Sequence, residues 1–263
     1  HRKGHYSHPG GEVQGMNAIT DSFRVAWIDM CYVRHNILSI LVTCLVSPIL
    51  YLVAFGYGLG QGMTVEGFDY ISFMIPGVIA LSTLTSCFST VSTKVMTQRV
   101  YYQSFDELFL CSMSPVSIVL GKSYAGVVRG LISAFILYAL GLCVSADMNL
   151  TVSAIVMIVV SCLVFSMLGV TCGMLANSHL TQTLITSLII MPMTFLCGTL
   201  FSLDALPGFA QAIIGVLPLT HTTGCIRASI LGTAFPWTSL LIILVFGFIF
   251  AAVSVYVVRK GRS

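Results

Sequence analysis

The chain has 263 residues, of which 57% are hydrophobic and only 8% are charged. A soluble domain carries about 25% charged residues, so this composition excludes a soluble protein and predicts an integral membrane protein. The net charge of +3 is small, and no basic patch with interleaved aromatic residues is present, which argues against a nucleic-acid partner.

The N-terminal region is predicted to hold a tail followed by an interfacial helix. Residues 1–15 are polar and glycine-rich, and we expect a flexible tail, an expression remnant or an upstream extension. Its three histidines are a weak indication of a metal site. Met16–Asn36 then places apolar side chains at helical spacing, at Met16, Ile19, Phe23, Trp27 and Met30. This pattern predicts an amphipathic helix in the membrane interface, the alternative being the soluble start of the first span.

Six apolar runs are long enough to cross a membrane, which takes about 20 residues. They cover about Ile37–Phe55, Ile71–Val91, Ile118–Val144, Leu150–Leu175, Leu180–Phe201 and Leu240–Val258. The predicted fold class is therefore all-α. Residues 16–263 would form a single transmembrane domain of six helices, with both termini on the same side.

The distribution of charge predicts which side that is. The basic residues on the side of the N-terminus are Arg24, Arg34, Lys94, Arg99, Lys122, Arg259, Lys260 and Arg262. The opposite side carries Glu66, Asp69, Asp147, Asp204 and one basic residue, Arg227. Because positive residues gather in cytoplasmic loops, we expect a multi-pass protein of the plasma or inner membrane with both termini in the cytoplasm.

The stretch Met191–Gly232 interrupts the pattern of simple spans. Asp204, Pro207 and Gly208 oppose a continuous helix, and Ala205–Val216 is too short to cross a bilayer. We expect short re-entrant helices there at the outer face, between the fifth and sixth spans and closed by Leu217–Thr220. Irregular backbone at this depth is tolerated only against protein or a water-filled cavity. The residues of this outer elbow, expected to border a pathway, are Asp204, Pro207, Pro218 and Arg227.

The longest cytoplasmic loop, Met96–Pro115, has a mixed apolar and acidic character. Its apolar residues include Tyr101, Phe105 and Leu108, beside the acidic pair Asp106 and Glu107. The pattern predicts a short amphipathic helix that docks into a groove on a partner protein. The alternative is a helix lying on lipid, which is less favoured because an anionic leaflet would repel the acidic pair.

No catalytic motif is found in the sequence. Gly121-Lys122-Ser123 lacks the glycine five residues earlier that a phosphate-binding loop needs, since that position is Val116. None of the nine acidic residues lies in a predicted span, which argues against a proton-coupled carrier and for energy supplied from elsewhere. We therefore expect neither an enzyme nor a bound metal or cofactor in this chain.

Two features of the third and fourth spans concern helix placement. Arg129 lies about eleven residues into the third span, where an unpaired arginine is costly. Either this helix begins well inside the cytoplasm or Arg129 faces an aqueous path; the apolar run proper begins at Leu131, which favours the first.

Pairs of glycines with the spacing of close helix packing occur at Gly126 and Gly130 and at Gly169 and Gly173.

Several segments carry a family resemblance that extends from about Met16 to the C-terminus. They are Ser47–Leu52 with Gly56–Gly60, Phe73–Ala80, Gly121-Lys122, Pro192–Pro207 (PMTFLCGTLFSLDALP) and Leu217–Arg227 (LPLTHTTGCIR). With these segments the chain resembles the membrane subunit of a type-2 ATP-binding-cassette exporter. It is most similar to the branch of the rhizobial nodulation-factor (lipo-oligosaccharide) export permeases. The last two segments are the specific ones.

The resemblance implies a half-transporter, in which two copies of the membrane subunit pair with two separate ATPase subunits that bind ATP and magnesium. The loop around Phe105–Leu108, with Tyr101, would be the coupling helix that docks on the ATPase, and Met16–Arg34 would flank this contact. The path would run between the two copies, lined by the first, second and fifth spans. Candidate lining residues are Tyr51, Phe55, Met191, Phe195, Thr199 and Phe201.

The leading functional hypothesis is the permease subunit of an ATP-driven exporter that moves an amphipathic substrate out of the cytoplasm. A lipid-linked saccharide or a hydrophobic drug-like molecule fits the aromatic, methionine and threonine side chains of the path better than an ion does. The alternative is a passive channel, or a membrane assembly or receptor subunit, with no ATPase partner. A co-purifying ATPase would distinguish the two.

Overall fold

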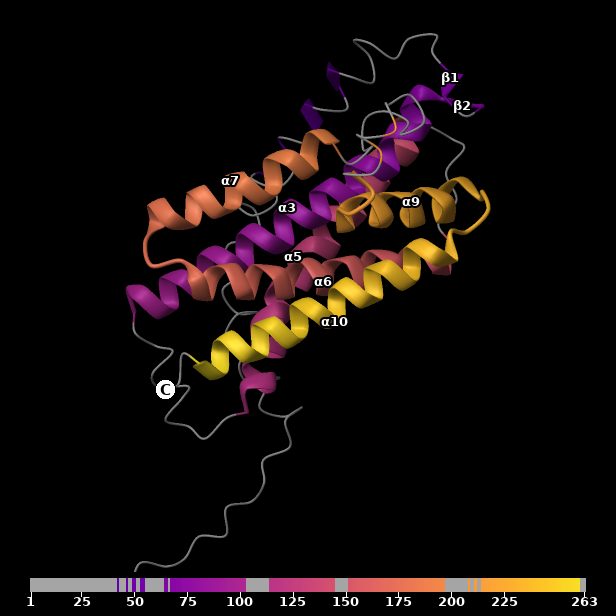
Figure 1. Ribbon diagram of the computed structural model, residues 1–263. Coiled ribbons are helices and arrows are strands. Elements are labelled where there is room, and N and C mark those ends of the chain that lie inside the picture. Colours follow the sequence, from indigo (N-terminus) through magenta and orange to yellow (C-terminus); the bar gives the residue numbers. More distant parts are fainter. Residues whose placement is uncertain are drawn as a thin grey trace, which may run out of the picture.

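A computed structural model describes residues 67–102, 114–144, 151–196 and 214–260, with residues 64–65 and a few positions before 55 and between 208 and 211. The described part is a bundle of helices that run between two ends (Figure 1). Its elements are β1 (Thr64–Val65), β2 (Phe68–Asp69), α3 (Tyr70–Val100), α5 (Pro115–Val144), α6 (Val152–Leu175), α7 (His179–Leu196), α9 (Pro218–Leu231) and α10 (Trp237–Lys260).

The structure confirms the prediction of an all-α polytopic membrane protein. Among the described residues, α3, α5, α6 and α10 are long and apolar enough to cross a membrane. The first predicted span lies mostly outside the described residues, as do residues 1–15 and the predicted interfacial helix. The described part of the fifth span is the 18-residue helix α7, and residues 197–201 lie outside. The count of six spans therefore stays a prediction.

Helix α3 is longer than the predicted second span. It has 31 residues, about 46 Å at 1.5 Å per residue, whereas the hydrocarbon core is about 30 Å thick. The predicted loop began at Met96, but no glycine or proline follows Val91 within the helix, and Val95 and Met96 are buried and extend its packed face. Helix formation therefore continues to Val100, beyond the predicted start of the loop at Met96.

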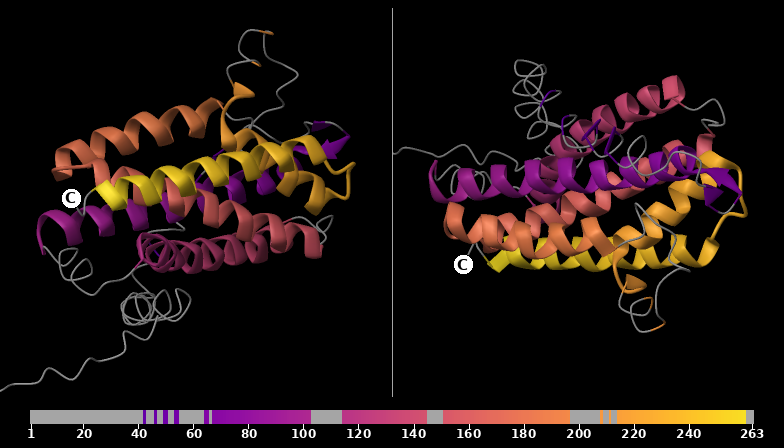
Figure 2. Two further views of the ribbon diagram at one scale, coloured as in Figure 1. Left: turned by 60° about the horizontal axis from the view of Figure 1, so that its bottom comes forward. Right: turned by 90° about the horizontal axis from the view of Figure 1, so that it is seen from above.

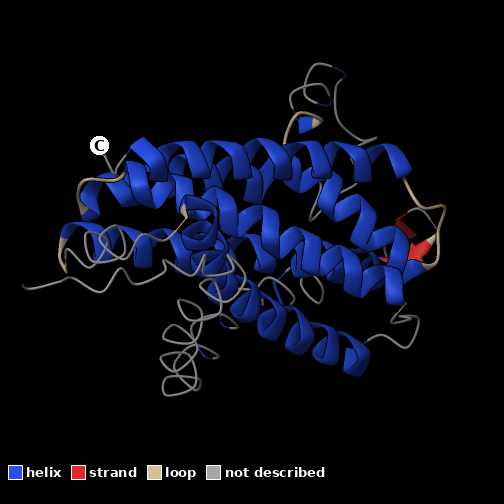
Figure 3. Ribbon diagram, turned by 90° about the horizontal axis from the view of Figure 1, so that it is seen from below, coloured by secondary structure: helices blue, strands red, loops and turns tan. Residues whose placement is uncertain are grey.

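Helix α3 is the central element of the bundle. It packs mainly against α6 and α5 and, near its start, against α9, so that its side chains from Ser72 to Leu84 are all buried, whereas its last turn is partly exposed. Helix α10 packs against α6 and α9, and α5 runs obliquely to the other long helices (Figures 2 and 3). Helix α7 lies at the edge of the bundle, beside α3 and with few contacts to α6.

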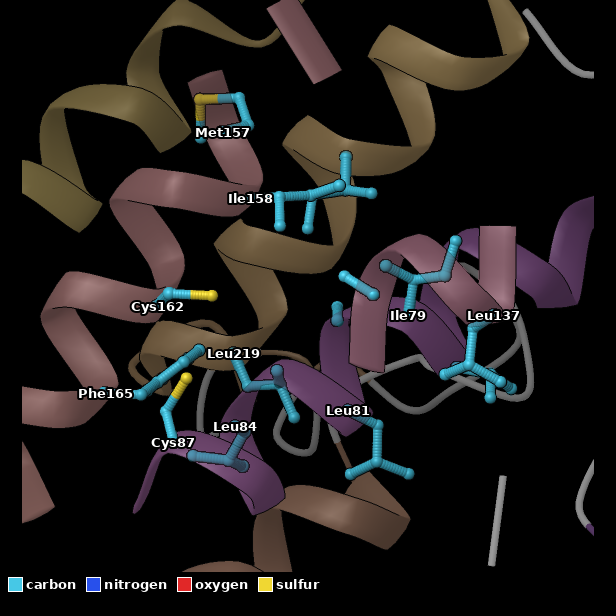
Figure 4. Close-up of a cluster of buried hydrophobic side chains, with 14 of the residues drawn as sticks. Ile79, Leu81, Leu84, Cys87, Leu137, Met157, Ile158, Cys162, Phe165 and Leu219 are labelled. Carbon is cyan, nitrogen blue, oxygen red and sulfur yellow. The ribbon is translucent and has the colours of Figure 1, made fainter. Parts of the chain in front are cut away.

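The core is built from apolar side chains of α3, α5, α6 and α9 (Figure 4), among them Leu84, Phe165 and Leu219. The glycines predicted to allow close packing lie where α3 meets α5 and α6. A Cβ atom at Gly173 would come within 2.6 Å of the Ser92 carbonyl oxygen, and one at Gly169 within 3.0 Å of the Phe88 carbonyl oxygen. The prediction of close packing at these glycines is confirmed.

Helix α5 also begins earlier than predicted, at Pro115. Its 30 residues span about 45 Å, which exceeds the hydrocarbon core and favours a start in the cytoplasm over an aqueous path at Arg129. Arg129 is half-buried and interacts with neighbouring groups.

Two small elements at one end of the bundle differ from the prediction. A hairpin of two-residue strands pairs Thr64 with Asp69 and Val65 with Phe68, turning at Gly67 with φ +84°, where no strand was expected (Figure 3). Helix α9 begins at Pro218, beyond the predicted short segment Ala205–Val216. Most of that segment lies outside the described residues, so the re-entrant arrangement stays a prediction. The sequence predicts that Leu217–Thr220 closes the short segment, but at the first helical position the missing N–H of Pro218 costs nothing, so this proline starts a helix.

The two ends of the bundle differ in charge. One end holds the C-termini of α3 and α10 and the turn between α6 and α7, with Lys94, Arg99, Arg259 and Lys260 nearby (Figure 1). The other end holds the β-hairpin and α9. We name them the inner end and the outer end after the predicted orientation, which itself stays a prediction.

Candidate coupling and transport site

The inner end of α3 leads directly into the predicted coupling segment. The helix closes with hydrogen bonds from the backbone N–H groups of Tyr101 and Tyr102 to the Thr97 carbonyl, at 3.0 and 3.2 Å. The Tyr101 side chain is 56% exposed and stacks on His179, the first residue of α7, with ring centroids 4.8 Å apart. Among the predicted coupling residues only Tyr101 is described; Phe105, Asp106, Glu107 and Leu108 lie outside the described residues.

Two further polar contacts join α3 to the start of α7. The guanidinium of Arg99 donates a hydrogen bond to the Asn177 side-chain oxygen at 2.5 Å. One helical turn into α7, the amide of Gln182 donates to the Ser92 hydroxyl and, at 3.2 Å, to the Thr186 hydroxyl. These contacts were not predicted. The available indication in the sequence was Gln182 itself, because a polar side chain inside an apolar run is costly unless it has a partner.

A serine cap fixes where α7 begins. The Ser178 hydroxyl accepts a hydrogen bond from the Thr181 backbone N–H at 3.2 Å and lies 3.0 Å from the Thr181 hydroxyl. Serine at this position satisfies a backbone donor that the first turn of a helix leaves free. The short turn and its cap hold Asn177, His179 and Gln182 in a defined register against α3.

Helix α7 exposes one apolar stripe along its length. Met191 and Phe195, both predicted to line the path, are 62% and 58% exposed, whereas Met193 between them is 6% exposed and packs in the core. The stripe continues toward the inner end with the exposed residues Leu180, Leu184 and Leu188. The structure thus brings two predicted lining residues together on one surface. Tyr51, Phe55, Thr199 and Phe201 lie outside the described residues.

The second span does not present a comparable surface. From Ser72 to Leu84 every side chain of α3 is buried within the chain itself. This burial argues against the expectation that the second span lines a path along its outer half. Helix α3 is instead a core helix, surrounded along this part by the other helices of the chain.

At the outer end, Arg227 joins α9 to the start of α3. Its Nε–H donates to the Phe73 carbonyl at 3.2 Å, and its guanidinium lies 3.7 Å from the centroid of the Phe73 ring, a cation–π geometry. Pro218 is the first residue of α9, and Gly232 ends the helix in the left-handed conformation with φ +72°. Asp204 and Pro207 of the predicted elbow lie outside the described residues.

A histidine links α9 to the neighbouring segments. The two ring nitrogens of His221 lie 3.1 Å from the Ser239 hydroxyl of α10 and 2.8 Å from the Gly215 carbonyl oxygen. Nearby in α9, burial raises the pKa of the Cys225 thiol to about 11, so this thiol stays protonated and unreactive. Within the described residues no three His, Cys, Asp or Glu side chains are placed to hold a metal ion.

These features define a polytopic helical membrane protein that has a polar inner junction and one helix with an exposed apolar stripe. Residues 27–231 match the family model described as ABC-2 type transporter. The chain belongs to this family, and the resemblance carried by Pro192–Pro207 and Leu217–Arg227 is confirmed. Membership implies association with an ATP-binding-cassette ATPase subunit.

Similar proteins include transport permeases from several bacteria. The chain is 27% identical over 204 residues to the inner membrane transport permease YadH of Escherichia coli strain K12, covering 75% of this chain and 79% of that protein. It is 30% identical over 199 residues to nodulation protein J of Rhizobium meliloti strain 1021, covering 72% and 73%. The corresponding protein of Bradyrhizobium diazoefficiens is 29% identical over 203 residues, covering 74% and 75%.

Proposed function

We propose that this chain is the membrane subunit of an ATP-driven exporter in the inner membrane. Two copies would assemble with two separate ATPase subunits, which bind ATP and magnesium, and both termini of the chain would face the cytoplasm. The observation that carries the proposal is the family match over residues 27–231, together with relatives that are named transport permeases. The sequence contributes no nucleotide-binding motif of its own, so hydrolysis is assigned to the partner.

The exposed stripe of α7 supports a path between two copies. Five large apolar side chains on one face are costly in water, so this face must meet lipid, a second copy or an amphipathic molecule. A path that opens between two copies would expose this face to the substrate in one state and to the partner copy in the other. Met191 and Phe195 are therefore the described residues we assign to the path.

The chemistry of that surface supports a proposal for the substrate class. Methionine and phenylalanine offer apolar and polarisable contacts but no charge to bind an ion. We assign an amphipathic substrate, a lipid-linked saccharide or a hydrophobic drug-like molecule, exported from the cytoplasm. ATP-driven closure of the ATPase dimer would displace the coupling segments, including Tyr101, and this displacement would open the interface between the two membrane subunits.

Purification of the tagged chain in mild detergent tests the proposal. We expect a stoichiometric soluble ATPase to co-purify and to hydrolyse ATP. A clean oligomer without an ATPase that still conducts or binds a solute would instead support the second candidate, a passive channel or a membrane assembly or receptor subunit.

A further inference from the structure

Helix α7 is held to the rest of the bundle differently at its two ends. At the inner end it meets α3 through directional polar contacts, whereas farther along it packs through apolar side chains such as Ile185, Ile189 and Met193. Pro192 removes one backbone N–H from α7 and so breaks the hydrogen bond that would reach the Leu188 carbonyl. The helix is thus fixed in register at one end and is weakened near the other.

Three separate contacts join the inner end of α3 to the start of α7: Gln182 bonds Ser92, Arg99 bonds Asn177, and Tyr101 stacks on His179. We call this set of six residues the polar clasp; Tyr101 directly follows α3, and Asn177 precedes α7 by two residues. We propose that the polar clasp transmits the movement of the coupling segment to α7 and so to the path. This inference rests on the proposed function and assigns positioning residues to it.

The geometry supports transmission because the clasp and the coupling segment share one helix. Arg99 and Tyr101 lie at the last turn of α3, next to the residues that lead into the coupling segment. Hydrogen bonds depend on direction and resist sliding, whereas apolar contacts do not. A displacement of the end of α3 would therefore carry residues 177–182 with it, while the rest of α7 could tilt along its apolar contacts.

An unpartnered oxygen inside the clasp indicates a second arrangement. Gln182 is 4% exposed, and its side-chain oxygen has no hydrogen-bond partner among the described residues. The side-chain oxygen of Gln98, next to Arg99, is likewise buried and unpartnered in the described part of the chain. Because buried polar groups are nearly always bonded, we expect these oxygens to gain partners in another state of the transport cycle.

The test uses the complete complex with its ATPase in lipid vesicles, so no substrate is needed. A spin label carried by an unnatural amino acid at position 188, on the exposed stripe, would report the distance between the two copies with and without ATP. ATP hydrolysis is measured in the same samples. We expect Gln182→Leu and Arg99→Ala to retain hydrolysis and to lower, by about fivefold, the ratio of the shifted to the unshifted distance population with ATP, the effect of losing one hydrogen bond.

Rescue and control variants separate transmission from general packing. The pair Arg99→Lys with Asn177→Asp replaces the contact by an ion pair and should restore the shift. Thr183→Val removes an exposed hydroxyl whose hydrogen bond within the described part of the chain stays inside α7, to the His179 carbonyl at 2.9 Å, and should leave the shift unchanged. Should Gln182→Leu fail to fold, Arg99→Ala decides the outcome, because its contact is exposed.

The possible failures are distinguishable. A full ATP-dependent shift in both clasp variants would overturn the role of the clasp and leave the proposed function intact. A wild-type complex that binds no ATPase, or that shows no shift with ATP, would overturn both together.

Discussion

Arg227 adds a polar contact to the apolar packing between α9 and the outer end of α3. A cation–π contact contributes about 0.5–2 kcal/mol, and a hydrogen bond from a charged group about 1.5–3 kcal/mol. We expect Arg227→Leu to lower the free energy of unfolding by about 1–3 kcal/mol, because the side chain is only half-buried. Thermal unfolding in detergent measures this. Arg227→Lys keeps the charge but loses the planar guanidinium, so its melting temperature should lie between those of the parent protein and Arg227→Leu. An unchanged melting temperature for Arg227→Leu would refute a stabilising role for Arg227.

Gly173 provides a second prediction for a single residue. Its missing side chain lets α6 approach α3, and a Cβ atom would lie 2.6 Å from the Ser92 carbonyl oxygen. Gly173→Ala must therefore displace backbone, and we expect a loss of stability of about 1–3 kcal/mol, measured by thermal unfolding. Gly224 in α9 is the matched control, because nothing lies within 4 Å of the corresponding Cβ position. Gly224→Ala should be neutral or slightly stabilising, and equal losses in both variants would contradict the packing argument.

Among the elements, those whose pattern is local in sequence could be predicted, and those that depend on distant partners could not. The long apolar runs and the glycine spacing predicted α3, α5, α6 and α10 and the close approach at Gly173. The end of α3 was misplaced, because hydropathy falls at the membrane surface although the helix continues. The polar clasp joins Arg99 to Asn177 across 78 residues and Ser92 to Gln182 across 90. Gln182 in its apolar run indicates that a partner is needed, but no local pattern could indicate which residue the partner is.

The exposed faces of α7 and α10 lead to different expectations. Both carry large apolar residues, but only the face of α7 is assigned to the path. Substituting Met191 and Phe195 together by alanine should reduce transport of an amphipathic fluorescent dye by roughly thirtyfold, since each large apolar contact contributes on the order of 1 kcal/mol. The matched control is Phe248→Ala on α10, where the side chain is 77% exposed and we expect it to face lipid. An equal loss of dye transport in the α7 and α10 variants would contradict the assignment of α7, rather than α10, to the path.

The acidic pair of the coupling segment leads to a prediction about a single loop. If Asp106 and Glu107 face the ATPase, replacing both by lysine reverses the charge of the docking surface without touching the described helices. We expect ATP hydrolysis to become uncoupled from transport, while the thermal unfolding of the bundle stays the same. Normal coupled transport by this variant would refute the assignment of this loop to the coupling contact.

At the scale of the whole molecule, the two ends of the bundle should lie on opposite sides of the membrane. Lys94, Arg99, Arg259 and Lys260 gather at one end, and positive residues are retained on the cytoplasmic side. Tyr102 at this end and Trp237 at the other are similarly exposed, at 72% and 71%. This makes them a matched pair of positions for testing the orientation.

Cysteines introduced at these two positions can be probed in intact cells with a membrane-impermeant maleimide. Trp237→Cys should be labelled from outside, whereas Tyr102→Cys should be labelled only after the membrane is permeabilised, each relative to the parent chain. The reverse pattern would place the predicted coupling segment outside the cell, where no ATP is available. It would therefore exclude the ATPase contact together with the orientation.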